Sequence, residues 1–178
     1  MARNIKVAAA QLGPIQKADT RQAVVARMLE LMRQAKGCDL IVYPELALTT
    51  FFPRWHYQDR SDADIWFERE MPGAATRPLF EEARRAAMAM SFGYAELTPG
   101  GQHFNTSILV DKAGTIVEMV LLGFNTPSVN SQNGGEGLAK RMFHHKLSLQ
   151  AGAYQNSTWV LAVANAASRT AITAWPAP

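Results

Sequence analysis

The chain has 178 residues, a hydrophobic content of 48% and a formal net charge of +3. This length is enough for one compact domain with its own hydrophobic core. The basic residues are spread along the chain, so the sequence offers no concentrated basic face for a nucleic-acid backbone.

The sequence also argues against a membrane-spanning segment and against internal disulfide bonds. No apolar window reaches the length of a membrane span, and the segment after Met1 lacks the apolar core of a signal peptide. A single cysteine, Cys38, excludes an internal disulfide framework and a cysteine-rich zinc site. We therefore expect a cytoplasmic protein with no nucleic-acid partner and no membrane partner.

The first part of the chain predicts a β-α-β unit. Ile5–Ala10 and Leu40–Tyr43 are apolar runs typical of buried strands. Between them, apolar residues recur at helical spacing over 24–35, and Asp19 or Thr20 can cap the start of this helix. Two strands joined through one helix are expected to be parallel neighbours.

Glu45 follows the second of these strands and is the main candidate for chemistry. Pro44 cannot donate a backbone hydrogen bond, so it ends the strand and leaves Glu45 at the carboxyl end. Ligand sites in open α/β sheets usually lie at that end. On local sequence alone, however, a carboxylate in an ordinary ion pair is the favoured interpretation.

The rest of the chain predicts further strands and helices. We expect residues 59–70, which are acidic and aromatic, to be a surface loop with a helical turn. Thr76 and Pro78 form a good start for a helix that continues to Met90. The remaining predictions are strands at Ser91–Ala95, Asn105–Val110, Thr115–Val117 and Trp159–Ala164, and a helix at Leu138–Gly152. Residues 165–178 lack clear periodicity, so we expect a poorly ordered tail.

Several ordered motifs together resemble the nitrilase superfamily of carbon-nitrogen hydrolases. These motifs are Gln11–Pro14, Tyr43–His56, Gly93–Leu97, Phe104–Val110 and Gly123–Pro127. Within them, the segment Thr49–His56 is most similar to the N-carbamoyl-D-amino-acid amidohydrolases. The resemblance extends from Ile5 to about Ala164.

The resemblance implies a fold and an activity. The fold is α/β, a partial α-β-β-α sandwich of the nitrilase type, in a domain over residues 1–164 with a seam near residue 117. The activity is hydrolysis of N-carbamoyl-D-amino acids to the D-amino acid, ammonia and carbon dioxide, with no cofactor and no metal. Homo-oligomers are also implied.

In this family a Glu takes the proton of a Cys thiol, the thiolate attacks the carbonyl, and a Lys stabilises the oxyanion. By the motif match, Glu45 is the catalytic general base. The same match places Asn125 and Thr126 close to the substrate. These assignments come from the resemblance alone.

The sequence departs from the family pattern for the other two catalytic groups. The Lys expected shortly after Thr115–Val117 and the Cys expected further on have no counterpart, and Glu118 begins what resembles a later strand. We infer an internal deletion near Val117 and an altered C-terminus. Cys38 precedes the Leu40 strand, so we expect it to lie more than about 10 Å from Glu45 and to be structural.

Two hypotheses therefore stay open. The chain is an enzyme that hydrolyses a linear amide or N-carbamoyl group through Glu45, or it is a non-catalytic fragment or pseudoenzyme. In the second case it acts through self-association or by binding an intact relative. We expect the chain by itself to be catalytically impaired, because the members of a catalytic triad act as a unit.

Overall fold

The computed structural model describes residues 4–52, 56–121, 138–155, 160, 163 and 171–175. Two compact units make up the chain: Met1–Leu122 with Val163–Pro178, and Gly123–Ala162. The second unit contains helix α3 (Leu138–Gln155), which extends past the predicted end at Gly152. Within the described parts, no helix is both long and apolar enough to span a bilayer.

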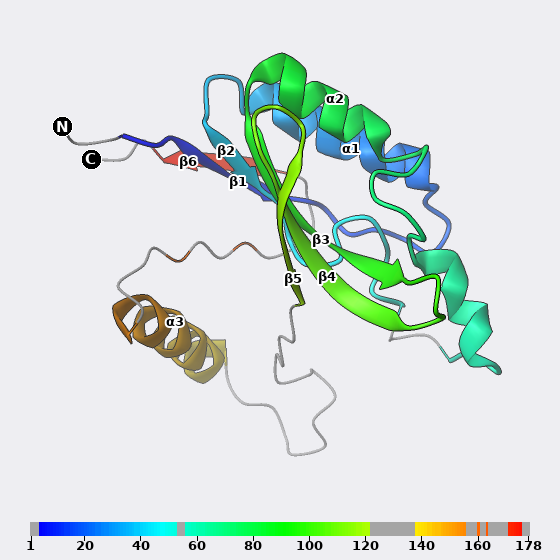
Figure 1. The fold of residues 1–178 in the computed structure, drawn as a ribbon. Coiled ribbons are helices and arrows are strands. Elements are labelled where there is room, and N and C mark those ends of the chain that lie inside the picture. The colour runs from blue at the N-terminus through cyan, green and yellow to red at the C-terminus, as the bar shows by residue number, and fades with distance from the viewer. Residues whose placement is uncertain are drawn as a thin grey trace. The chain divides into compact units, whose positions relative to one another are not determined.

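The first unit is built on one mixed sheet of six strands in the order β5-β4-β3-β2-β1-β6 (Figure 1). β2 pairs in parallel with both β1 and β3, and the outer pairs are antiparallel. The strands are β1 (Val7–Gln11), β2 (Leu40–Val42), β3 (Ala89–Leu97), β4 (His103–Val110), β5 (Ile116–Leu121) and β6 (Ala171–Trp175).

The predicted β-α-β unit at the start of the chain is confirmed. Helix α1 (Arg21–Gln34) connects β1 to the parallel strand β2. Thr20 is its N-cap, and the Thr20 hydroxyl oxygen accepts a hydrogen bond from the Ala23 backbone nitrogen at 3.2 Å. This cap satisfies one of the backbone donors that a helix start leaves without an intrahelical partner.

Helix α2 (Arg77–Ala86) connects β2 to β3 and is shorter than predicted. The spacing of apolar residues predicted a helix that continues to Met90. The structure ends the helix because Ala87 adopts a left-handed conformation, with a φ of 49°. Residues from Ala89 onward then pair with β2 as strand β3.

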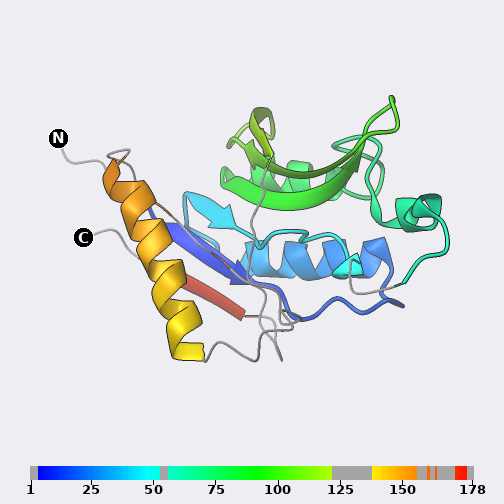
Figure 2. The same ribbon diagram turned by 90° about the horizontal axis from the view of Figure 1, so that it is seen from below.

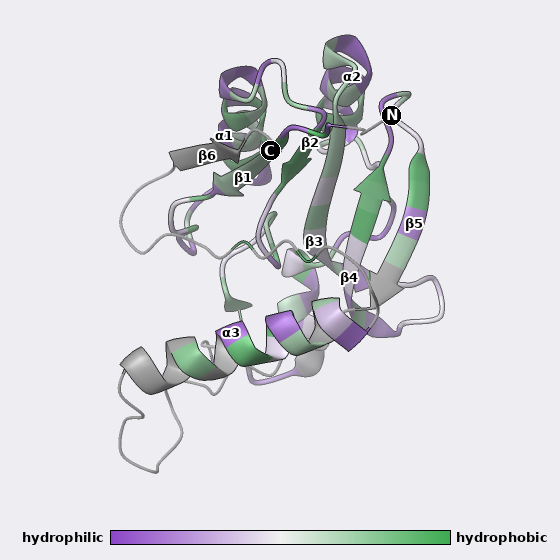
Figure 3. Cartoon of the chain, turned by 90° about the vertical axis from the view of Figure 1, so that its left-hand side faces the viewer, coloured by the Kyte–Doolittle hydropathy of each residue, from purple (hydrophilic) through white to green (hydrophobic). Residues whose placement is uncertain are grey.

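Both helices cover the same face of the sheet (Figure 2). The core lies between these layers and includes residues from the helices and the central strands: Met28, Leu31, Leu79, Ile41, Phe92 and Ile108. Figure 3 shows a mainly hydrophobic β2 beside helices that alternate hydrophobic and hydrophilic residues. The predicted α/β class is confirmed.

The opposite face of the sheet is less buried. Along β4, Thr106 and Ile108 are buried, whereas Asn105 and Ser107, which alternate with them, are half-buried. Because side chains alternate between faces along a strand, Asn105 and Ser107 point away from the helices. This second face carries the polar side chain that contacts Glu45.

The end of the chain differs from the sequence prediction. We predicted a poorly ordered tail over 165–178, but Ala171–Trp175 pairs antiparallel with the full length of β1. These five residues are uncharged and include β-branched and aromatic side chains, which suit a strand. β1 supplies the backbone partners that the local sequence could not reveal.

Two further predictions concern the sheet and its neighbouring loop. β5 continues through the predicted seam near residue 117 and pairs with β4, with a register shift between Leu109 and Val110. The expected helical turn within 59–70 is a 3-10 helix, Arg60–Trp66. The strand predicted at 159–164 falls largely outside the described residues.

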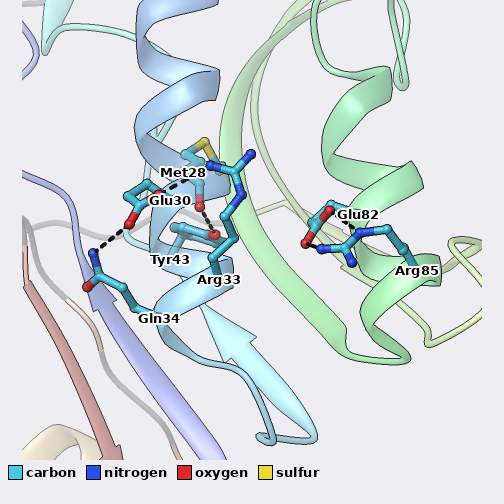
Figure 4. Close-up of polar contacts among 7 residues, drawn as sticks. All are labelled: Met28, Glu30, Arg33, Gln34, Tyr43, Glu82 and Arg85. Carbon is cyan, nitrogen blue, oxygen red and sulfur yellow. Dashed lines mark hydrogen bonds and ion pairs between the residues drawn. The ribbon is translucent and has the colours of Figure 1, made fainter.

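Tyr43 joins α1 to the end of β2. Its side chain is buried, and its hydroxyl donates a hydrogen bond to the Met28 carbonyl oxygen at 2.7 Å (Figure 4). Burial, with a smaller effect of the Glu82 carboxylate, raises the pKa of Tyr43 well above its ordinary value of 10. In the same view, the ion pair Arg33–Glu30 lies at the surface, where such pairs contribute little, and the exposed Arg85 pairs with the half-buried Glu82.

We predict that Tyr43→Phe lowers the free energy of unfolding at neutral pH by about 0.5–1.5 kcal/mol, because a buried hydrogen bond is lost. The substitution should also reduce the decrease in the free energy of unfolding that occurs as the pH rises above 10. An unfolded tyrosine ionises near pH 10, whereas folded Tyr43 stays protonated. The contribution of Tyr43 to the free energy of unfolding is therefore complete below that pH, and it decreases by up to about 1.4 kcal/mol per pH unit above it.

Urea unfolding at neutral pH and at two values above pH 10 measures both effects. Tyr154→Phe, at an exposed position on α3, is the control. Burial raises the pKa of Tyr94 to about 12. In the variant, Tyr94 therefore still causes part of the decrease in the free energy of unfolding above pH 10. An unchanged alkaline slope in Tyr43→Phe would contradict the prediction.

Candidate active site

Glu45 lies just beyond the carboxyl end of β2, as predicted, and its side chain is half-buried. Its Oε1 atom accepts a short hydrogen bond from Nδ2 of Asn105 on β4. The strand between them is β3, on which Ala95 is the register partner of Asn105. The carboxylate is therefore held at the sheet by a side chain two strands away.

The backbone of the Glu45 segment continues the sheet beyond β2. The Ala47 backbone nitrogen donates to the Gly93 carbonyl oxygen at 2.8 Å, and the Gly93 nitrogen donates to the Pro44 carbonyl oxygen at 3.5 Å. Leu46 lies between these contacts with a left-handed φ of 50°. Such a conformation costs roughly 1 kcal/mol or more outside glycine, so the surrounding contacts must maintain it.

Gly93 permits this close approach. A Cβ atom at position 93 would lie 3.1 Å from the Glu45 Cα and 3.1 Å from the Leu46 nitrogen. Both atoms belong to backbone that cannot rotate away. A side chain at position 93 would therefore require the Glu45 backbone to shift by a few tenths of an ångström.

The segment that follows Glu45 is unusual for a loop because Leu46, Ala47, Leu48, Thr49 and Thr50 are all buried. Buried backbone needs hydrogen-bond partners within the protein. Arg21, at the first position of α1, donates to the Leu48 carbonyl oxygen through Nη1 and to the Trp66 carbonyl oxygen through Nη2, the latter at 3.2 Å.

The guanidinium of Arg21 also pairs with Glu68, with Nε 2.5 Å from Oε1. Glu68 in turn joins the sheet: its nitrogen donates to the Ala95 carbonyl oxygen at 2.8 Å, and its carbonyl oxygen accepts from the Leu97 nitrogen at 2.9 Å. Burial raises the pKa of Glu68, and Arg21 opposes this effect only in part. The pair thus links α1 to the segment that pairs with the carboxyl-terminal part of β3.

An aromatic cluster lies beside this ion pair. The Phe67 ring packs against Phe52, with ring centroids 5.0 Å apart, and against the His103 ring at 4.6 Å. His103 Nε2 lies 2.7 Å from Asp64 Oδ1. These contacts attach the segment of the 3-10 helix to the start of β4.

Cys38 lies at the other end of β2, as predicted. It is half-buried and packs against the core. Its neighbour Asp39 accepts hydrogen bonds from Lys112 Nζ at 2.5 Å and from the Lys6 backbone nitrogen at 3.0 Å, which together lower the pKa of Asp39. The structure therefore does not bring the sulfur or the Lys112 ammonium to Glu45.

The other sequence-predicted site residues, Asn125 and Thr126, fall outside the described residues. Sequence reasoning also missed two residues that the structure brings into the site. Asn105 lies in the motif Phe104–Val110, and this was its signal in the sequence. Arg21 gave no signal beyond an unexpected charge at a helix start. Among the described residues, no group of three or more His, Cys, Asp or Glu could hold a metal ion.

The carbon-nitrogen hydrolase family model matches residues 6–126 of this chain. The chain belongs to the carbon-nitrogen hydrolase family. The predicted α/β fold of the nitrilase type is thereby confirmed. The more specific likeness to N-carbamoyl-D-amino-acid amidohydrolases stays a prediction.

Solved structures of carbon-nitrogen hydrolases and amidases share the fold. An N-terminal amidase with a Gln-Val peptide is 19% identical with a TM-score of 0.55, over 68% of this chain and 28% of that one. An amidase from Nesterenkonia sp. is 20% identical with a TM-score of 0.51, over 66% and 42%. A carbon-nitrogen hydrolase from Helicobacter pylori G27 is 16% identical with a TM-score of 0.55, over 66% and 39%. The chain thus spans less than half the length of each.

We predict that Gly93→Ala destabilises this carbon-nitrogen hydrolase domain by about 1–3 kcal/mol, because the added methyl group must displace the Glu45 backbone. The matched control is Gly100→Ala, where the nearest atom to an added Cβ is the Thr98 hydroxyl oxygen at 3.8 Å. The control should stay within about 0.5 kcal/mol of wild type. Urea unfolding of the three proteins measures the difference, and equal stabilities would show that position 93 tolerates a side chain.

Proposed function

We propose that this chain carries the general base of a hydrolase acting on the C–N bond of N-carbamoyl-D-amino acids, and that Glu45 is this base. The observation that carries the proposal is the hydrogen bond from Asn105 to a half-buried Glu45 at the carboxyl end of β2. Membership of the carbon-nitrogen hydrolase family supports it.

The geometry suits proton transfer. The Asn105 amide fixes one carboxylate oxygen, so the second oxygen can take a proton from a thiol and return it to the departing ammonia. The thiolate would attack the ureido carbonyl carbon and break its bond to the terminal nitrogen, which leaves as ammonia. Water would then hydrolyse the resulting thioester, which returns the thiol and releases an N-carboxy amino acid that decomposes to carbon dioxide and the free D-amino acid. A base fixed in position contributes more than a mobile one, because the reacting atoms are already aligned.

We further propose that the chain by itself does not complete this reaction. Cys38, the single cysteine of the sequence, lies at the amino end of β2, and the Lys112 ammonium binds Asp39 there. Neither the predicted nucleophile nor the predicted cation is therefore supplied to Glu45 by these residues. Asn125 and Thr126 are retained as proposed substrate contacts.

Ammonia release from N-carbamoyl-D-phenylalanine tests the catalytic proposal. Wild type, Glu45→Gln and Cys38→Ser should all give the same background rate. Turnover abolished by both substitutions would identify Cys38 as the nucleophile and refute our interpretation of it. Turnover abolished by Glu45→Gln alone would support Glu45 as the base but contradict the proposed impairment.

Binding tests the substrate class without requiring turnover. Addition of N-carbamoyl-D-phenylalanine should shift the NMR signal of the Asn105 side-chain amide, because the substrate enters beside the Glu45 carboxylate. The L-enantiomer should cause a smaller shift at the same concentration. The absence of any shift with the D-compound would reject this substrate class.

One observation favours a second function, self-association or binding to an intact relative. β5 ends the sheet formed by the described residues. It exposes two apolar side chains, with Val117 56% and Met119 52% accessible. An edge strand with apolar side chains is a template for pairing with another chain. We propose that this edge forms a homo-oligomer.

Sedimentation velocity tests the homo-oligomer. Wild type should sediment as a species larger than a monomer, and the double variant Val117→Lys, Met119→Lys should sediment as a monomer, since charges on an edge strand oppose pairing. Ile65→Lys is the control, because Ile65 is apolar and 70% exposed but lies on the 3-10 helix. A monomeric wild type, or equal effects of the control, would refute the proposed edge.

A further inference from the structure

Arg21 occupies a position that is electrostatically unfavourable for a cation. It is the first residue of α1, where the unpaired backbone N–H groups create a partial positive charge. The first turn of α1 contains no acidic residue that would offset this charge. The guanidinium must therefore gain its stabilisation from partners outside the helix.

Those partners come from three different segments. The guanidinium donates to the Leu48 carbonyl oxygen, donates to the Trp66 carbonyl oxygen at 3.2 Å, and pairs with Glu68 at 2.5 Å. The side chains of Arg21 and Glu68 are only 18% and 14% exposed. Water screens such a group less than it screens a surface ion pair, so these contacts constrain the chain more strongly.

One of these partners, the Leu48 carbonyl, lies three residues after Glu45 in the sequence. Leu48 belongs to the buried segment that begins just after Glu45. This segment is attached to β3 by the hydrogen bond from Ala47 to Gly93. The carbonyl of the next residue, Leu48, is a second anchor, because it accepts from Arg21. Loss of the second anchor would free the segment to turn about the first, and the adjacent Glu45 would move with it.

We propose that Arg21 is a positioning residue that holds the Glu45 carboxylate against Asn105 by anchoring the Leu48 carbonyl. The inference rests on the proposed function only in naming Glu45 as the working carboxylate.

The shape of the guanidinium is central to this role. Arginine presents several donors in a fixed plane, and it therefore bridges two carbonyl oxygens and a carboxylate at once. A lysine would keep the positive charge beside Glu68 but would lose this planar set of donors. Arg21→Lys therefore separates positioning from simple charge pairing.

The same helix provides a matched control. Arg27 also donates to a backbone carbonyl oxygen, that of Pro14 at 3.0 Å, and also pairs with a carboxylate, that of Asp19 at 2.8 Å. These partners lie before α1 rather than in the Glu45 segment. Arg27→Met thus removes an equivalent pair of contacts from α1 without removing the anchor at Leu48.

The experiment follows the Glu45 segment by NMR and hydrogen exchange in wild type, Arg21→Met, Arg21→Lys and Arg27→Met. In Arg21→Met the Ala47 amide should exchange about tenfold to a hundredfold faster relative to the Met28 amide in the core. The Asn105 side-chain amide signal should move toward its position in Glu45→Gln. Arg21→Lys should show both changes to a smaller extent.

Arg27→Met should leave both signals at their wild-type values. The proposal is overturned if Arg21→Met keeps the wild-type Asn105 signal, or if Arg27→Met changes it equally. Should Arg21→Met fail to fold, Arg21→Lys decides, because a wild-type signal in that variant would show that charge alone suffices. These measurements do not depend on turnover, so failure of the proposed function would leave their outcome unaffected.

Discussion

The close approach of two backbones at Gly93 is the constraint on which the candidate active site depends. The Glu45 segment lies so near to β3 that a Cβ atom at position 93 would contact the Glu45 Cα at 3.1 Å. This approach allows the hydrogen bond between Ala47 and Gly93 and brings the carboxylate within reach of Asn105 on the next strand. The position of Glu45 is thus a property of the whole sheet rather than of its own loop.

The same region concentrates features that are unfavourable when each is considered alone. Leu46 has a left-handed backbone, the segment after it is buried, and Arg21 places a cation at a helix start. In an otherwise consistent fold, such departures tend to gather at functional sites. Here they are coupled, because Arg21 supplies the donor that the buried Leu48 carbonyl requires.

The parts of the fold that were predictable are those specified by local pattern. Uninterrupted apolar runs and helical spacing predicted β1, α1 and β2, and Pro44 correctly indicated where β2 ends before Glu45. The end of α2 was not predictable in this way, because Ala87 continues the apolar spacing although its backbone is left-handed. Strand β6 was missed because its partner, β1, lies at the other end of the sequence.

The site shows the same division. The position of Glu45 followed from local sequence and from motif resemblance, whereas its contact with Asn105 depends on the order of β2, β3 and β4 in the sheet. The role of Arg21 depends on three segments that meet only in the folded chain. Pairwise contacts between distant segments leave no periodic signal in one sequence.

The two ends of β2 have different roles, and this difference limits the chemistry available. The amino end is an anchoring point, where Asp39 binds Lys112 and the Lys6 backbone beside Cys38. The carboxyl end presents Glu45 to the less buried face of the sheet. Side chains at opposite ends of a rigid strand cannot meet without breaking its pairing with β1 and β3. The single thiol of the sequence, that of Cys38, is therefore held at the end of β2 away from Glu45.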